Sequence, residues 1–364
     1  MPILHIRWMP NEHQPGPRIA INSMLRDNPG VAATVPLNLP GWSGLSVLFR
    51  EQAALDECLR CLPHCENLPS SLVVRSFECP PKNTLDRPII VVGAPRSGTT
   101  LLFETLANSA GVWTVGGESH SILENKHEIP GEDGNRMTAE DANEETRFVI
   151  PALFVSLLRN RHDHLYLDQK SPNGPERVRL LEKTPKNSLR IPFLRALFPD
   201  CRFVFLYREP TENIGSLIDA WGSPDFSKSY KIDGARWKFL LPPDWKSLIG
   251  QPIPVIAAAQ WRAANEFLLN DLATIPNEDW CFVRYEQLVN DPASLIRRLC
   301  DFASLEMDQE LAASLEQPLP LSRSTLTPPS HEKWRKHITE IDRVLPSVQD
   351  VVDRVSNAGF RQTI

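Results

Sequence analysis

The sequence lacks any run of apolar residues long enough to cross a lipid bilayer, and no such run opens the chain. The first ten residues carry His5 and Arg7 among apolar side chains, which is not the pattern of a secretory signal peptide. Cysteine is scarce, and its odd number, seven in 364 residues, fits reduced thiols better than a disulfide framework. We therefore expect a cytoplasmic protein without a membrane span.

Positive charge is also not in excess. The net charge of −6 gives no general attraction to nucleic acid, so any phosphate chemistry must occur in a local pocket. It also argues against a highly sulfated polysaccharide as a substrate. Hydrophobic residues at 41% and charged residues at 23% are close to globular averages. The length suits one large domain with an accessory part, and we expect an N-terminal accessory segment over residues 1–86 and the main domain over 87–364.

Strand and helix patterns alternate in the main part of the chain. Short apolar runs of the buried-strand type cover residues 89–92, 203–207 and 280–285, and helical patterns follow each of them, over 99–106, 211–221 and 292–302. This alternation predicts an α/β fold with a P-loop-like central parallel sheet flanked by helices. Ligands of such sheets bind beyond the carboxyl ends of the strands.

Three other segments are distinctive. Within the first 86 residues, one clear helical pattern runs from Ser43 to Leu62. Residues 125–147 are rich in Glu, Asp and Asn and indicate an exposed insertion, and residues 221–245 form a second insertion rich in Pro and Trp. The first insertion can be a lid or substrate collar or an ordinary solvated loop, and the role of the second is open.

The loop after the first predicted strand carries the strongest signal. Its sequence, GAPRSGTT over residues 93–100, has the glycine spacing of a P-loop, but Thr99 stands where a nucleotide triphosphatase needs its lysine. Glycines let backbone N–H groups approach an anion, and the helix that follows adds its positive end. Arg96 supplies a cation within the loop. The pattern predicts a phosphate-binding loop without the triphosphatase lysine.

These eight residues strongly resemble the 5′-phosphosulfate loop of sulfotransferases that use 3′-phosphoadenosine 5′-phosphosulfate (PAPS). The resemblance implies that the enzyme moves a sulfonate group from PAPS, its co-substrate, to an acceptor hydroxyl. It also implies that Arg96 contacts the bridging oxygen of the leaving phosphate. The 5′-phosphate would be bound by the rest of the loop: Ser97, Gly98, Thr99 and Thr100.

A second block lies at the end of a later strand. Arg208 and, eight residues on, Ser216 match the pair that binds the 3′-phosphate in this family. A guanidinium offers a planar fork of donors to a dianionic phosphate, and a serine early in a helix adds a short hydroxyl donor. The two blocks occur in the family's order, each at a strand-to-helix turn.

Three weaker blocks extend the resemblance over about residues 87–340. Residues 182–187 look like the Lys-Thr-Pro block of the bacterial and tyrosylprotein branches, in which the lysine, here Lys183, stabilises the sulfonate in flight. Residues 283–288 resemble a block whose tyrosine, here Tyr285, lies near the adenine. A basic C-terminal segment resembles one that closes over the nucleotide, and its residues are Trp334, Arg335 and Lys336. Leu101 stands where cytosolic members stack a tryptophan on the adenine, so the adenine pocket must be built differently.

Transfer to an alcohol needs a base for the hydroxyl proton. After the loop helix, Gly117-Glu118 matches the Gly-Glu pattern of the nearest branch, so Glu118 is the first candidate and His120 the second. In a strand both side chains would lie on one face. No metal is expected, because the transferred group carries less charge than a phosphoryl group and cations already serve the leaving side.

Other interpretations remain open at this point. The loop could belong to a nucleotide-dependent kinase or triphosphatase, or to a nucleotide-binding protein without turnover. Cys58, Cys61 and Cys65, next to His64, could form a metal site, although thiols buried along one face of a helix explain the spacing better. The acceptor could be a small molecule, a carrier-bound chain, a glycan or a peptide. The oligomeric state is also open.

Overall fold

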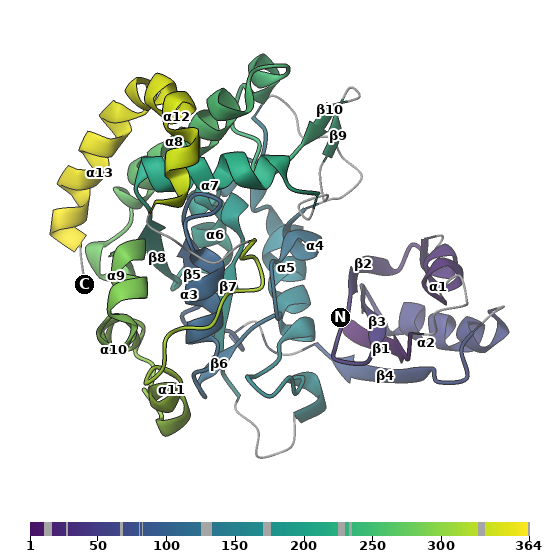
Figure 1. Ribbon diagram of the computed structural model, residues 1–364. Coiled ribbons are helices and arrows are strands. Elements are labelled where there is room, and N and C mark those ends of the chain that lie inside the picture. Colours follow the sequence, from purple (N-terminus) through teal and green to yellow (C-terminus); the bar gives the residue numbers. More distant parts are fainter. Residues whose placement is uncertain are drawn as a thin grey trace. The chain divides into compact units, whose positions relative to one another are not determined.

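A computed structural model describes residues 1–10, 17–26, 28–65, 68–79, 81, 83–124, 133–169, 176–224, 230–232, 235–326 and 332–362 (Figure 1). The chain forms two compact units, which are described separately: residues 1–86, 113–125 and 143–178 form the first unit, and residues 87–112, 126–142 and 179–364 form the second. The strands are β1 (Pro2–Trp8), β2 (Val31–Pro36), β3 (Ser43–Phe49), β4 (Val73–Glu78), β5 (Ile89–Val92), β6 (Val112–Trp113), β7 (Arg179–Lys183), β8 (Arg202–Tyr207), β9 (Tyr230–Ile232), β10 (Ala235–Trp237) and β11 (Trp280–Arg284). The helices are α1 (Pro17–Arg26), α2 (Gln52–Cys61), α3 (Thr99–Leu106), α4 (His120–Leu123), α5 (Glu144–Leu157), α6 (Ile191–Leu197), α7 (Pro210–Gly222), α8 (Ile253–Leu272), α9 (Tyr285–Asn290), α10 (Pro292–Ala303), α11 (Gln309–Ser314), α12 (Ile338–Val344) and α13 (Gln349–Gln362).

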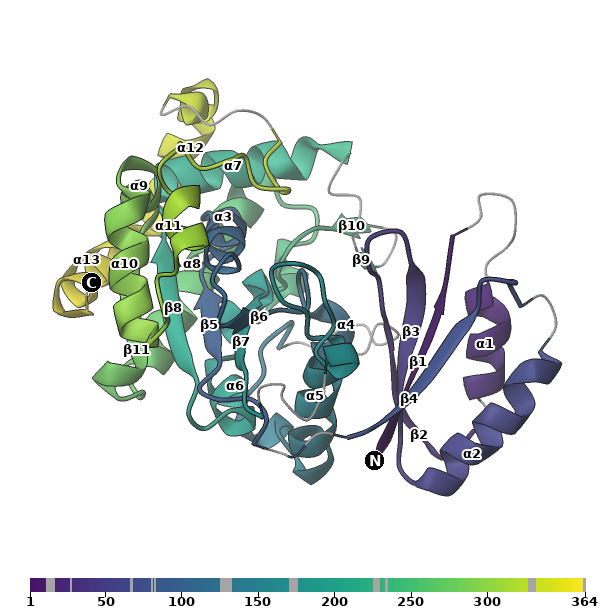
Figure 2. The ribbon, with the colours of Figure 1, turned by 90° about the horizontal axis from the view of Figure 1, so that it is seen from below.

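A five-stranded sheet in the order β11-β8-β5-β7-β6 is the centre of the second unit. β5 pairs in parallel with β8 on one side and β7 on the other, and β11 pairs in parallel with β8. Figure 2 shows β11, β8, β5 and β7 side by side. This arrangement confirms the predicted α/β class with a central parallel sheet flanked by helices.

The core explains why the apolar runs form strands. All four residues of β5 are completely buried, as expected for a strand covered on both faces. Along β8, Val204 and Leu206 face the cluster that includes residues of α3 and α10, while Tyr207 packs against Trp261 of α8 with ring centroids 6.0 Å apart. Alternate residues of one strand therefore pack against different helices.

The predicted strand-helix units are confirmed, with two differences. The third strand ends at Arg284, and Tyr285 begins α9. β7 was not predicted, because its five residues include Arg179, Glu182 and Lys183, all of them buried charged side chains. A hydropathy pattern does not identify a strand that buries charges.

The first unit contains an antiparallel sheet in the order β2-β3-β1-β4. With α1 after β1 and α2 after β3, this is the split β-α-β-β-α-β arrangement of the ferredoxin-like fold. Both helices lie on the same side of the sheet (Figure 2). The single helix predicted over Ser43–Leu62 is therefore wrong in its first half, which is β3; the helix begins at Gln52. Residues on both faces of β3 are buried, so the strand lacks the alternation of apolar and polar residues that would have distinguished it from the helix that follows.

The other face of this sheet packs against α5. Ser46 of β3 donates a hydrogen bond to Ser156 of α5 at 2.9 Å. His5 of β1 is opposite Ser46 in the strand register and is completely buried. Burial, and then the charge of Arg7, lower the pKa of His5 to about 4. The imidazole is therefore neutral in the folded unit.

The cysteines near α2 do not lie along one helix. Cys58 is buried, Cys61 ends α2, and Cys65 follows a short 3-10 turn and contacts the Met24 sulfur at 3.5 Å. Over the described residues, no group of three or more His, Cys, Asp or Glu side chains is arranged to hold a metal ion. Nor does any helix there have the length and apolar character to cross a membrane.

The two predicted insertions are only partly exposed. Residues 125–132, 225–229 and 233–234 lie outside the described part of the chain. Asn135 is buried and accepts a hydrogen bond from the Leu241 backbone at 2.7 Å, and Arg136 forms a two-pronged ion pair with Asp271 of α8. In the second insertion Trp237 and Trp245 are buried together. The exposed-loop prediction is therefore wrong for residues 134–137, where Asn135 and Arg136 find buried partners, whereas Asp133 and residues 138–141 are exposed as predicted.

Candidate active site

The loop between β5 and α3 needs both of its glycines. A Cβ atom on Gly93 would lie 2.4 Å from the Leu206 carbonyl oxygen. Gly98 has φ +98°, and a Cβ atom there would lie 2.5 Å from the Tyr285 ring. Arg96 also adopts a left-handed φ of 69°, a conformation that costs energy for a residue with a side chain. The loop therefore holds Arg96 in a strained conformation at the start of a helix.

Ser97, within this loop, is held by main-chain and side-chain contacts. Its backbone N–H contacts the Ala94 carbonyl oxygen at 3.1 Å. In the amide orientation that satisfies both of its atoms, Asn213 of α7 accepts from Ser97 N and donates to Pro95 O, each at 3.1 Å. Within the part of the chain that the structure describes, the Ser97 hydroxyl is buried and has no hydrogen-bond partner. An additional acceptor or donor would satisfy it.

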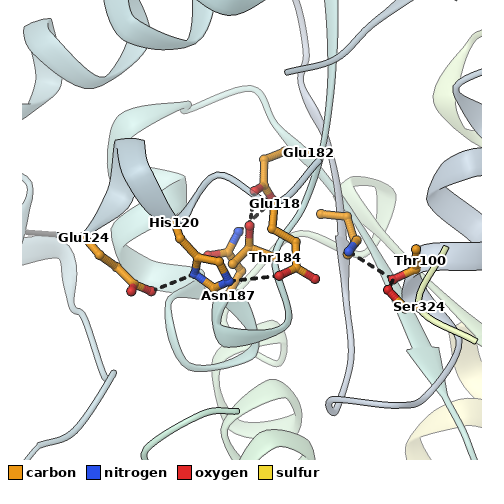
Figure 3. A network of polar contacts seen from close by, with 9 residues as sticks. Thr100, Glu118, His120, Glu124, Glu182, Thr184, Asn187 and Ser324 are labelled. Atoms are coloured by element: carbon orange, nitrogen blue, oxygen red, sulfur yellow. Dashed lines mark hydrogen bonds and ion pairs between the residues drawn. The ribbon is translucent and has the colours of Figure 1, made fainter. Parts of the chain in front are cut away.

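The Arg96 side chain meets two segments distant in sequence. Its Nε atom donates to Ser216 Oγ at 3.4 Å, and Nη1 donates to the Ser324 carbonyl oxygen at 2.8 Å. The structure thus brings together Arg96 and Ser216, which the sequence assigned to two different phosphates. Ser324 also contacts Thr100 Oγ1 through its hydroxyl at 3.4 Å (Figure 3).

Lys183 reaches the same helix start from β7. Its Nζ atom donates to Thr100 Oγ1 at 3.1 Å and lies 5.9 Å from the centre of the Phe103 ring. Lys183 is almost completely buried. Since Val91 and Lys183 are paired in the sheet, the lysine leaves the sheet beside the phosphate loop.

Arg208 follows β8 and is held on three sides. Nη1 donates to the Arg96 carbonyl oxygen at 3.2 Å, and Nε and Nη2 both donate to one oxygen of Glu212 at 3.1 Å. The guanidinium also stacks over the Tyr285 ring, 4.3 Å from its centre. Arg208 and Tyr285, predicted from separate motifs, therefore stack on each other, and Arg208 is also bonded to the main chain of the loop.

The basic C-terminal segment forms a 3-10 turn over Lys333–His337. Trp334 packs against α7, where a Cβ atom on Gly215 would lie 2.9 Å from the Trp334 Cβ. Lys336 pairs with Asp219 of α7 at 2.8 Å, while Arg335 pairs with Glu332 at 3.3 Å and is largely exposed. Trp334 and Lys336 thus contact α7, and the Arg335 guanidinium lies 5.7 Å from the centre of the Trp334 ring.

Several cationic side chains lie near Arg208. Burial lowers the pKa of Lys333; the charge of Asp219 opposes this shift, and the charges of Lys336, Arg96 and Arg208 add to it. Such mutual repulsion is relieved when an anion binds among the cations. The second unit therefore places several cations close to one another.

Glu118 and His120 belong to the first unit and are described on their own. These two residues do not lie in a strand: His120 is the first residue of α4, and Glu118 lies two residues before that helix. Glu118 Oε2 is 2.9 Å from His120 Nε2, and His120 Nδ1 is 3.1 Å from Glu124 Oε1 (Figure 3). A protonated imidazole can donate to both carboxylates, whereas a neutral one donates to only one of them.

Sequence reasoning missed three residues that shape this site. Asn213 and Glu212 precede Ser216 in α7 and hold Ser97 and Arg208, and Ser324 supplies a backbone oxygen to Arg96. Buried asparagine in an apolar helix face was an available signal for the first. Ser324 gave none, because its contact with Arg96 is made by the main-chain carbonyl oxygen.

A model of the sulfotransferase family matches residues 88–309. The chain is 22% identical to protein-tyrosine sulfotransferase A of Caenorhabditis elegans over 228 residues, which cover 61% of this chain and 51% of that protein. It is 23% identical to the nodulation protein NoeE of Sinorhizobium fredii over 298 residues, covering 75% and 66%. The chain thus spans less than two thirds of the length of either relative.

Among solved structures, a sulfotransferase from Mycobacterium avium is similar at 17% identity and a TM-score of 0.40, covering 73% of this chain and 76% of that one. The family match begins one residue before β5 and continues through β7, β8, β11 and α10. It therefore includes the phosphate loop, Lys183, Arg208 and Tyr285. Because this match covers more than half of the chain, the chain belongs to the sulfotransferase family.

Proposed function

We propose that this enzyme transfers a sulfonate group from PAPS to an acceptor hydroxyl by in-line displacement. The observation that carries the proposal is the grouping of cations at the carboxyl end of β5. Arg96 lies within the loop that opens α3, and Lys183 reaches Thr100 in the first turn of that helix. Family membership sets the reaction type, and this grouping supports a donor that carries several negative charges.

The residues present fit such a nucleotide. The backbone N–H groups at the start of α3 and the positive end of the helix favour a phosphate. The buried Ser97 hydroxyl still needs a partner. The cations that lower the pKa of Lys333 are those that would neutralise the two phosphate groups of PAPS. All of these features belong to one compact unit.

Each residue then has a proposed role. Ser97, Gly98, Thr99 and Thr100 hold the 5′-phosphate, and Arg208 with Ser216 holds the 3′-phosphate. Tyr285 and Trp334 lie on the adenine side, and Arg335 and Lys336 add positive charge at the rim. Arg96 and Lys183 stabilise the negative charge that grows on the leaving phosphate and on the sulfonate.

For the acceptor we propose that Glu118 takes the hydroxyl proton while the oxygen attacks sulfur. The sulfur–oxygen bond to the phosphate breaks in the same step, and the electron pair remains on the phosphate. The contact with His120 at 2.9 Å supports this role, because an imidazole beside the carboxylate can orient it. His120 is the second candidate for the base.

Binding and turnover together test the proposal. Calorimetry should show tighter binding of 3′,5′-adenosine bisphosphate (PAP) than of AMP or ATP, and PAP should form from PAPS when phenols, alcohols, glycans and tyrosine peptides are offered as acceptors. Lys183→Ala should lower PAP formation without abolishing PAP binding. Tighter binding of ATP with release of phosphate would indicate a triphosphatase, and PAP binding without any turnover would indicate a binding protein.

A further inference from the structure

Directly before Lys183 lies a carboxylate for which the proposed reaction has no use. Glu182 is the fourth residue of β7 and is 1% exposed. One of its oxygens accepts from Thr184 Oγ1 and the other from Asn187 Nδ2, each at 2.7 Å (Figure 3). Thr184 and Asn187 are themselves completely buried. A strand interior that buries a carboxylate has to compensate for its desolvation, and these short bonds do so in part.

The three residues surround the point at which the chain leaves the sheet. Asn187 N also donates to the Thr184 carbonyl oxygen at 2.8 Å, which closes the turn that begins the 3-10 segment Pro185–Leu189. Glu182 therefore ties both ends of this turn to the strand. Because successive strand residues point to opposite faces, the Lys183 side chain leaves on the other face, toward Thr100.

We propose that Glu182 is a positioning residue for Lys183. By holding Thr184 and Asn187, it fixes the backbone on both sides of Lys183 and hence the direction of the ammonium group toward the start of α3. The inference rests on the proposed function, in which Lys183 stabilises the sulfonate. A carboxylate suits this position because each of its two oxygens can accept from one of the two donors.

Substitutions separate positioning from acid-base chemistry. Glu182→Ala removes both acceptors and should lower the rate of PAP formation from PAPS about 10- to 100-fold, the cost of a displaced catalytic group. Glu182→Gln keeps one acceptor and the side-chain shape, and the Thr184 hydroxyl can reverse its bond, so this variant should retain most of the rate. If Gln and Ala are equally slow, or if Gln removes the acidic limb of the pH-rate profile, Glu182 is itself the base and the proposal is wrong.

Thr184→Val provides a milder perturbation if the alanine variant does not fold. It keeps the side-chain volume, removes one donor, and should lower the rate while leaving PAP affinity unchanged. In a Lys183→Met background the same substitution should have no further effect, because the group being positioned is gone. Ser188→Ala is the matched control: its hydroxyl bonds to Pro185 O at 2.9 Å in the same turn and has no contact with Glu182, so the rate should not change.

A structural measurement keeps this test independent of the reaction. In a crystal structure of Thr184→Val, Lys183 Nζ should have moved from its 3.1 Å contact with Thr100 Oγ1. An unmoved lysine, or a rate loss that persists in the Lys183→Met background, overturns the positioning role. If the wild-type protein forms no PAP from PAPS, with water or any acceptor, the proposed function fails, while the position of Lys183 still decides the present inference.

Discussion

Removing Arg208 tests the assignment of the 3′-phosphate directly. In the structure its guanidinium is mostly buried, stacks on Tyr285, and is held at one edge by Glu212 and at one nitrogen by the Arg96 carbonyl oxygen. Arg208→Ala deletes the proposed cation and leaves the Glu212 carboxylate without this partner. The phosphate would then lose an attractive charge and face a less neutralised negative one.

The size of the effect follows from these contacts. A hydrogen bond to a charged group contributes about 1.5–3 kcal/mol, so the loss of PAP affinity should be about 2 kcal/mol, or roughly 30-fold. Loosening of the Tyr285 ring would affect any adenine nucleotide alike. The difference between ligands with and without the 3′-phosphate therefore isolates the phosphate contact.

Calorimetric titration of wild-type protein and Arg208→Ala with PAP and with AMP measures this difference. The PAP affinity should fall by the predicted factor, and the AMP affinity should change far less. Arg284→Ala is a suitable control, because Arg284 donates to Glu209, the residue just before α7, at 2.7 Å and has no proposed role in binding. Equal weakening of both ligands by Arg208→Ala would show that Arg208 is structural, and the assignment of the 3′-phosphate would have to be withdrawn.

Three further predictions concern other parts of the chain. Gly98→Ala should cost on the order of 1–3 kcal/mol in unfolding free energy and weaken PAP binding, since its Cβ would collide with Tyr285 at a positive φ; denaturant titration measures the first effect. Glu118→Gln should reduce turnover roughly 10²- to 10⁴-fold with PAP affinity unchanged, and His120→Ala should cost less; the reverse order in steady-state kinetics would make His120 the base. The pKa of His5 is lowered from 6.5 to about 4, so the unfolded chain binds a proton that the folded chain does not; stability should fall by up to about 3 kcal/mol as the pH drops from 6.5 to 4, and His5→Leu should flatten this dependence in urea titrations.

The phosphate loop was predictable because its chemistry is local. Glycines at residues 93 and 98, the cation at Arg96 and the apolar strand before them are adjacent in sequence, and the structure assembles them as one loop. The contact between Arg96 and Ser216 was not predicted, because the family resemblance assigns the two residues to different phosphates and they lie 120 positions apart. No spacing rule reports a contact of that range.

The N-terminal sheet was missed for a related reason. β1 pairs with β3 and β4, and these pairings depend on residues about 40 and 70 positions away. Over Ser43–Phe49 the apolar residues are buried on both faces, by α1 and α2 on one side and α5 on the other, so the alternation typical of a strand is absent. The tertiary environment, rather than local propensity, decides that this segment is a strand.

β7 is the place where local rules fail and the proposed chemistry concentrates. Arg179, Glu182 and Lys183 occupy three of its five positions and are each less than a tenth exposed. Burying them costs stability that apolar residues would not cost, and it is tolerated only where fixed partners compensate, as Thr184 and Asn187 do for Glu182. A strand that violates hydrophobic patterning at the edge of a phosphate loop is therefore a better indicator of a reacting site than the regular strands beside it. It follows that an apolar β7 would leave the buried Thr184 and Asn187 donors without their acceptor, so it should destabilise the fold as well as remove the cation that we propose for the sulfonate.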